Sequence, residues 1–448
     1  MSAYNKNMTE GKELNHIVLF TLPLLAGNLF QQLYNVVDSI IVGKYLGKDA
    51  LAAVGATGST TFLFNTLCIG LGLGAGILIA QRFGAGKENE VKTLIANSAY
   101  VLGGFGIIMS FVSVTFAPLM LRYMMVPEEL FPTSLGYMRI VCSGTVAVAA
   151  YNWINSVMRS LGDSKTPLIF LIVASVLNAG LDLLFVVVFK MGANGAALAT
   201  ITAQAMSALG SITFALRNNP CFKLTKENTT ADPRLMIKVI KTGVPISLQN
   251  AMIAVSMVYL QRVANSFGGT VMAAYTATMR VEQLIQQPFS SLSAAVSAFT
   301  GQNIGAGKPE RVVKGYKESV KVSSGFSVIM LVVFMLTSNI IVGFFVSDNA
   351  VIEIGGMALK LTSWFYVFLG LIYTTRGLLN GAGDVGYSMI NGIAEVAGRI
   401  GFAMLLVHIP KIGWWAVWGT TCLTWFFTAV MSLIRYFSGE WRKKAFAG

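Results

Sequence analysis

The sequence QRFGAGK at residues 81–87 returns as QNIGAGK at residues 302–308, a displacement of 221 positions. The same displacement carries KMG at residues 190–192 onto KIG at residues 411–413. A register that holds from residue 81 to residue 192 indicates an internal duplication of a long unit. We therefore expect two lobes with the same fold.

The longest polar stretch of the chain lies between the two copies, at roughly residues 218–236. We interpret it as a cytoplasmic linker loop that joins an N-terminal lobe at residues 1–217 to a C-terminal lobe at residues 237–448.

The composition shows that both lobes belong in a membrane. Of the 448 residues, 54% are hydrophobic and only 12% are charged, whereas soluble domains carry about 25% charged residues. A membrane-spanning helix needs about 20 apolar residues, and twelve such stretches follow one another. We place them at approximately 16–43, 50–82, 92–122, 131–159, 165–189, 193–217, 237–265, 270–303, 311–346, 351–380, 385–409 and 412–437.

These stretches predict an all-α integral membrane protein with twelve transmembrane helices. Each lobe has six helices, an even number, so both lobes have the same orientation in the membrane. We expect two six-helix bundles related by a pseudo-twofold axis along the membrane normal.

The net charge of +13 is explained by membrane topology and does not call for a nucleic-acid partner. With the N-terminus inside, 23 of the 33 lysines and arginines fall at the termini and cytoplasmic connections, Arg376 among them, and 7 fall on the opposite side. This bias follows the positive-inside rule. We expect a multi-pass protein of the inner (plasma) membrane with both termini cytoplasmic.

Polar residues gather on a few helix faces of the N-terminal half. In the first span they stand at relative positions 0, 3, 4 and 7, which is one face of a helix. The fifth span carries an Asn–Asp pair four positions apart. The residues are Gln31, Tyr34, Asn35 and Asp38 in span one, Tyr137 and Asn155 in span four, Asn178 and Asp182 in span five, and Thr200 and Gln204 in span six.

Interhelical hydrogen bonds account for one or two such residues, but not for the two carboxyl groups of Asp38 and Asp182. A charge at the bilayer centre costs about 2.5–3.5 kcal/mol. The first six spans contain no lysine or arginine in their interior except Arg139 in span four. An uncompensated carboxylate pair in an apolar bundle must bind a proton or a metal cation.

The second half differs in its charges. Asn178 maps onto Arg399, and Glu395 stands four residues before Arg399, so that pair can neutralise itself across one helical turn. Arg280 and Glu282 are two residues apart and need other partners. We therefore place the coupling site in the N-terminal lobe and keep Glu282, Arg280, Glu395 and Arg399 as reserve candidates.

These features resemble the MATE family of multidrug and toxic compound extrusion transporters, and in particular its prokaryotic DNA-damage-inducible branch. The resemblance rests on Pro23, on QQLYNVVDSIIVG at residues 31–43, on the two Gln-x-x-Gly-Ala-Gly turns and on the six-plus-six layout. It implies that Pro23 is a hinge. It also implies a cation site at Asp38, Asn178, Asp182 and Thr200, with H⁺ or Na⁺ as the bound ion. It further implies a surrounding polar network at Tyr137 and Asn155, and Gln31 in the lining of the same cavity. From their positions on the polar helix faces we add Tyr34, Asn35 and Gln204 to the polar network and substrate cavity.

The function that the resemblance implies is secondary active multidrug efflux, an antibiotic-resistance activity. Amphipathic, often cationic drug-like compounds would leave by antiport with alternating access. The residues leave H⁺ and Na⁺ both open as the coupling ion, and we expect no other cofactor. We expect a monomer in contact with membrane lipid.

Three alternatives remain at this point. A lipid-linked oligosaccharide flippase of the same superfamily would usually have fourteen spans and basic cavity residues. An enzyme is disfavoured because the two histidines stand alone and neither HExxH nor GxSxG occurs. A channel would need no carboxylate pair.

Overall fold

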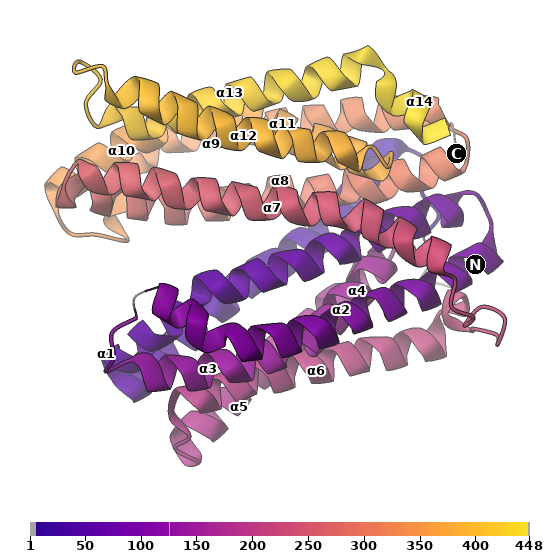
Figure 1. The fold of residues 1–448 in the computed structure, drawn as a ribbon. Coiled ribbons are helices and arrows are strands. Elements are labelled where there is room, and N and C mark those ends of the chain that lie inside the picture. The colour runs from indigo at the N-terminus through magenta and orange to yellow at the C-terminus, as the bar shows by residue number, and fades with distance from the viewer. Residues whose placement is uncertain (1–5, 125, 447–448) are drawn as a thin grey trace. The chain divides into compact units, whose positions relative to one another are not determined.

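The computed structural model describes residues 6–124 and 126–446 (Figure 1). For residues 48, 49, 51, 52, 56, 59, 60, 63 and 446 it describes the backbone only. Within these residues the regular secondary structure is helical throughout, which confirms the predicted all-α fold class.

The first half of the chain forms α1 to α6. The longest of these, α1, is interrupted at Gly47, whose φ of 81° is not helical, so it supplies two spans, Glu13–Gly47 and Phe64–Gly84. The helices are α1 (Glu13–Gly84), α2 (Glu88–Tyr123), α3 (Phe131–Ser143), α4 (Thr145–Ser160), α5 (Lys165–Asp182) with its π-helical extension η1 (Leu183–Val188), and α6 (Gly192–Asn218), followed by the 3₁₀ turn η2 (Pro220–Phe222).

The second half forms α7 to α14. Its helices are α7 (Pro233–Ser266), α8 (Gly269–Gly305), α9 (Pro309–Gly343), α10 (Asn349–Ser363), α11 (Tyr366–Gly381), α12 (Val385–Val407), α13 (Trp415–Ser438) and the short α14 (Glu440–Phe446).

The described helices account for the twelve predicted spans. Nine are long and apolar enough to cross a membrane, and two bent pairs, α3 with α4 and α10 with α11, add two more crossings with bends of 43° and 53°. The twelfth is α8, which has 37 residues. It is less apolar because Arg280, Glu282 and several glutamines lie along its middle.

The bend between α3 and α4 is a difference from the continuous helix expected at residues 131–159. The break is at Gly144. A Cβ atom at this glycine would lie 2.5 Å from the side chain of Ile201 on α6. The glycine therefore lets α6 approach the break closely, and the helix changes direction there.

The chain packs into two compact units whose borders fall inside α1 and α7. Unit 1 holds residues up to Asn7 and Leu22–Ser247, and unit 2 holds Met8–Thr21 and Leu248–Gly448. The predicted lobes, by contrast, meet in the loop at 218–236. The borders lie close to Pro23 and Pro245, two prolines 222 positions apart, one more than the displacement of the repeat.

Close backbone contacts explain why the beginning of α7 belongs to unit 1. A Cβ atom on Gly74 of α1 would lie 2.5 Å from the backbone of Gly243, and Ser247 donates a hydrogen bond to the carbonyl of Leu67 at 3.0 Å. Only glycine leaves room for this approach of two helices, which is the role of small residues in membrane bundles.

The N-terminal arm, residues 8–13, packs within unit 2 on the second copy of the repeated turn. The backbone N–H of Met8 donates to Gln302, and Asn303 donates back to the carbonyl of Met8. Arg311 donates to the carbonyl of Gly11 and forms an ion pair with Glu13 at 3.1 Å. The sequence repeat gave no sign of this contact.

The predicted linker at 218–236 is not a free loop. Asn97 of α2 donates to the carbonyl of Thr230 and accepts from the N–H of Asp232, and Asn228 donates to Asn89 at 2.6 Å. These contacts hold the connection against α2 within unit 1.

Candidate functional site

The carboxyl groups of Asp38 and Asp182 meet inside unit 1. Asp38 lies on α1, and Asp182 is the last residue of α5, where the chain passes into the π-helical turns of η1. The two carboxyl groups are within hydrogen-bonding reach of one another, and Asp182 is fully buried. The sequence spacing placed these residues on two separate helix faces, and the structure brings the two faces together.

Asn178 links this pair to α6. It lies one turn before Asp182, and its amide is oriented by its hydrogen-bond partners. The amide N–H₂ donates to Asp182 at 2.7 Å, and the amide oxygen accepts from the backbone N–H of Thr200 at 3.0 Å. Asn178 therefore positions the Asp182 carboxyl against α6.

Two tyrosines complete the cluster. The hydroxyl of Tyr34, one turn before Asp38 on α1, is hydrogen-bonded to Thr200. Tyr137 of α3 lies close to both Asp38 and Asp182. The structure thus brings together six of the predicted residues: Tyr34, Asp38, Tyr137, Asn178, Asp182 and Thr200.

The other predicted residues of this half lie outside the carboxyl cluster. Gln31 and Asn35 are exposed on α1, and Gln204 is half-buried one turn after Thr200. Asn155 is buried and is hydrogen-bonded to Tyr151 rather than to an aspartate. Pro23 lies inside α1, two residues beyond the border between the units, where its ring removes one helical hydrogen bond.

The charge of the aspartate pair is not balanced by the protein. One carboxyl oxygen of Asp38 and one of Asp182 are buried without a hydrogen-bond partner among the described residues, and neither aspartate forms an ion pair there. Two carboxyl groups in contact cannot both ionise without a compensating charge. The cluster therefore needs a shared proton or a bound cation.

The available donor atoms restrict that cation. Among the described residues no group of three or more His, Cys, Asp or Glu side chains could hold a metal. The oxygen ligands beside Asp38 and Asp182 are the hydroxyl groups of Thr200 and Tyr34, whereas Asn178 turns its N–H₂ group toward Asp182. Oxygen ligands of this kind suit hard cations rather than soft ones.

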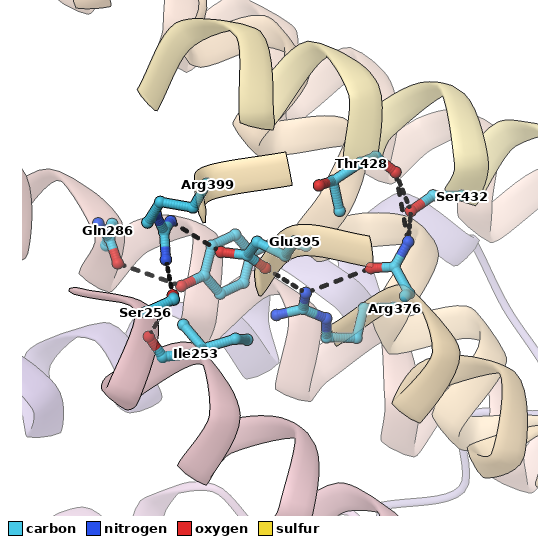
Figure 2. A network of polar contacts seen from close by, with 10 residues as sticks. Ile253, Ser256, Gln286, Arg376, Glu395, Arg399, Thr428 and Ser432 are labelled. Atoms are coloured by element: carbon cyan, nitrogen blue, oxygen red, sulfur yellow. Dashed lines mark hydrogen bonds and ion pairs between the residues drawn. The ribbon is translucent and has the colours of Figure 1, made fainter. Parts of the chain in front are cut away.

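Unit 2 contains a different arrangement, in which Glu395 bridges two arginines (Figure 2). Its carboxylate oxygens lie 3.1 Å from Arg399 on the same helix, α12, and 3.1 Å from Arg376 on α11. Arg399 also donates to Ser256 of α7, and Arg376 to Asn391. The predicted Glu395–Arg399 pair is confirmed.

The placement of Arg376 at a cytoplasmic connection was wrong. Its side chain lies within unit 2, where it is 12% exposed and paired with Glu395. The sequence could not show this pair, because the two residues stand on different helices that pack through the tertiary fold. Ser256 and Asn391 were missed for the same reason.

Arg280 and Glu282 separate as their spacing predicts. Arg280 is exposed, whereas Glu282 is buried and one of its carboxyl oxygens has no hydrogen-bond partner among the described residues. Glu282 lines a cavity of about 50 Å³ together with Gln286, Tyr373, Arg376, Glu395 and Arg399.

A family model named MatE matches the chain twice, at residues 23–184 and 245–405. The chain belongs to the MatE family. The two matched segments begin 222 residues apart and end 221 residues apart, within one residue of the interval between the repeated turns, which confirms the duplication. This is a family of transporters, so the chain is a multi-pass membrane transporter and not a member of an enzyme family.

Named relatives of this MatE chain cover nearly its whole length. The probable multidrug resistance protein YpnP of Bacillus subtilis is 30% identical over 384 residues, 86% of this chain and 85% of the relative. The probable multidrug resistance protein NorM of Thermotoga maritima is 24% identical over 96% of this chain and 93% of its own. A crystal structure described as MATE in the bent conformation shares the fold with a TM-score of 0.91, at 23% identity and 98% coverage of each chain.

Proposed function

We propose that this chain is a secondary active multidrug efflux transporter that exports amphipathic, often cationic drug-like compounds in exchange for protons or sodium ions. One observation carries the proposal: Asp38 and Asp182 are in contact inside unit 1, and no basic residue among those that the structure describes forms an ion pair with either of them. The family and the names of the relatives supply the substrate class.

Antiport follows if the cation and the substrate prefer different conformations. Coupling requires only that each ligand binds one conformation more tightly than the other. In the outward-open state the aspartate pair takes up a cation and the substrate leaves. In the inward-open state the cation leaves and a new substrate binds. Asn178 donates to Asp182 and is itself held by the backbone N–H of Thr200, so Asn178 sets the geometry in which the cation is bound.

The driving force limits the stoichiometry. A tenfold proton gradient supplies about 1.4 kcal/mol, and a charge that crosses 100 mV adds about 2.3 kcal/mol. Exchange of one proton for one monovalent cationic substrate is electroneutral and gains only the first amount. Efficient export of a cation therefore calls for more than one coupling ion per cycle.

The proposal also covers the membrane location, the topology and the oligomeric state of the protein. The charge bias supports a place in the inner (plasma) membrane with both termini cytoplasmic. Each unit holds its own buried polar cluster within one chain, so we propose that the transporter works as a monomer in contact with lipid.

The decisive experiment is efflux of ethidium or a fluoroquinolone in proteoliposomes, with pH and sodium gradients imposed separately. Wild-type protein should respond to one of the two gradients, which identifies the coupling ion. Asp38→Asn and Asp182→Asn should each reduce gradient-driven efflux to the level of protein-free vesicles, and Glu395→Gln should reduce it less.

A matched control is Asp348→Asn. Asp348 caps the N-terminus of α10 at the exposed end of that helix, and asparagine caps a helix equally well, so efflux should stay at the wild-type level. Normal efflux in both Asp38→Asn and Asp182→Asn would disprove the proposed site.

A further inference from the structure

A continuous row of buried polar side chains follows one face of α12 in unit 2. Ser388, Asn391, Glu395 and Arg399 stand three or four positions apart, which places them on one face of the helix. All four are buried. At the beginning of α12 the row starts at Asp384, which is fully buried and pairs with Arg435 and Lys444.

Side chains of the neighbouring helices extend this row into a network. Asn391 donates to Ser432 of α13 at 2.8 Å and accepts from Arg376 of α11 at 3.3 Å. Arg376 in turn reaches Glu395, as Figure 2 shows. We call these residues, from Asp384 to Arg399 with Arg376 and Ser432, the α12 column.

The α12 column is not saturated by protein hydrogen bonds. Five polar side-chain atoms on or beside it are buried without a partner among the described residues: Ser388 Oγ, Asn380 Oδ1, Arg376 Nε, Thr424 Oγ1 and Thr428 Oγ1. Buried polar groups in proteins almost always have a partner, and the usual one is an ordered water. The column therefore offers a line of positions for water through the interior of unit 2.

Glu282 of α8 lies at the inner end of the column. It is 8% exposed, and one of its carboxyl oxygens has no hydrogen-bond partner in the described ranges 6–124 and 126–446. The Glu282 carboxyl group is hydrogen-bonded to the side chain of Thr362 on α10. The cavity of about 50 Å³ that it shares with Arg376, Glu395 and Arg399 is large enough for a few water molecules.

The charges around Glu282 depend on whether it carries a proton. Arg376 and Arg399 stand against Glu395, so an ionised Glu282 balances the group and a protonated Glu282 leaves one net positive charge. Of these charged residues, Arg399 has the strongest electrostatic interaction with Glu282. The other titratable groups that face Glu282 are Tyr275, Tyr366 and Cys422, from α8, α11 and α13, together with Tyr373 on the cavity wall.

We propose that Glu282 is a second proton-binding carboxyl group of the transporter and that the α12 column carries water and protons between Glu282 and the end of unit 2 that holds Asp384. The proposal rests on the antiport proposed above and adds a second coupling ion to it. Because a proton on Glu282 changes the net charge beside Arg399, its uptake and release differ between conformations that pack α8 and α12 differently.

The first test is an infrared pH titration of the purified full-length protein. The protein carries Asp38→Asn and Asp182→Asn, so that the carboxyl pair of unit 1 contributes no band. This protein should show the carbonyl stretching band of a protonated buried carboxyl group, and the band should vanish at high pH. Adding Glu282→Gln should remove the band, whereas adding Glu353→Gln, at an exposed glutamate of α10, should leave it unchanged.

Thr362→Val provides a second variant that keeps the Glu282 carboxyl group. It removes the hydroxyl group beside it, so the band should shift in position and remain. A band that persists in Glu282→Gln, or one that does not respond to Thr362→Val, would overturn the assignment. These measurements need no transport, so they stand apart from the test of the proposed function.

The second test measures the ratio of protons to substrate in proteoliposomes from the proton gradient that just stops net efflux. Glu282→Gln should lower this ratio by one proton per cycle. Ser388→Val, which fills one position of the column, should slow proton-driven efflux about tenfold and leave the ratio unchanged, and Thr337→Val on α9 is its control. An unchanged ratio in Glu282→Gln would refute the second site, and a wild-type rate in Ser388→Val would refute the column.

Discussion

The two units carry the same duplicated fold but balance their buried charges in opposite ways. In unit 1 Asp38 and Asp182 face one another, and neither has a basic partner in the part of the chain that the structure describes. In unit 2 Glu395 has two, Arg376 and Arg399. A carboxylate with built-in counterions has no need of a mobile ion, whereas a pair without them must take one up. The comparison shows that substitution of a few residues separates a carboxyl pair that must bind an ion from a carboxylate, Glu395, whose ion pairs hold its helices together.

The largest expected effect comes from making unit 1 resemble unit 2. Asp182→Ala introduces the residue that the duplication places at Ala403, and gradient-driven efflux should fall to background. The double variant Asp182→Ala/Ala403→Asp moves the carboxyl group to the equivalent position of unit 2. It should stay inactive, because Arg399 lies one turn away and neutralises the new charge. Restored efflux in the double variant would show that a carboxyl group in unit 2 can bind the coupling ion beside Arg399, and would contradict the contrast between the two units.

The next largest effect concerns the stability of unit 2. Arg399→Ala leaves Glu395 and Ser256 with one partner fewer in a buried site, and loss of one member of a buried ion pair costs about 3–5 kcal/mol. Thermal unfolding in detergent should show a clear drop in Tm. Arg262→Ala, at an exposed position of α7, should leave Tm unchanged. An unchanged Tm in Arg399→Ala would mean that the ionic cluster does not stabilise the bundle.

A smaller effect is expected where unit 1 positions its carboxyl pair. Thr200→Val keeps the shape of the side chain and removes the hydroxyl group that is bonded to Tyr34. Loss of one hydrogen bond, about 1 kcal/mol, should weaken apparent affinity for the coupling ion roughly fivefold and leave maximal efflux near wild type. A change in maximal efflux alone would show that Thr200 acts on transport rather than on ion binding.

A further effect, on stability and not on transport, concerns the N-terminal arm on unit 2. Arg311 holds it through Gly11, Glu13 and the carbonyl of Met8. Arg311→Ala should lower stability by about 1–2 kcal/mol and make the bond after Lys12 accessible to trypsin. Lys314→Ala on the same helix serves as the control. Resistance to trypsin in Arg311→Ala would show that the arm does not depend on this residue.

Contacts within one helix were predictable from the sequence, and contacts between helices were not. The four-residue spacing identified Asn178 with Asp182 and Glu395 with Arg399, because helical periodicity alone brings such pairs onto one face. The pairing of Arg376 with Glu395 depends on how α11 and α12 pack, which no spacing encodes. The twelve spans followed from apolar length, but the bend at Gly144 followed from the proximity of Ile201, a tertiary contact.

The placement of the N-terminal arm in unit 2 has a consequence for biosynthesis. The arm leaves the ribosome well before its partner Gln302, which follows Met8 by 294 positions. Helices α1 to α6 are complete before that partner exists. Docking of the arm is thus a late step of folding, and a nascent chain that stalls before α8 is finished would present residues 8–13 to the quality-control machinery of the cell.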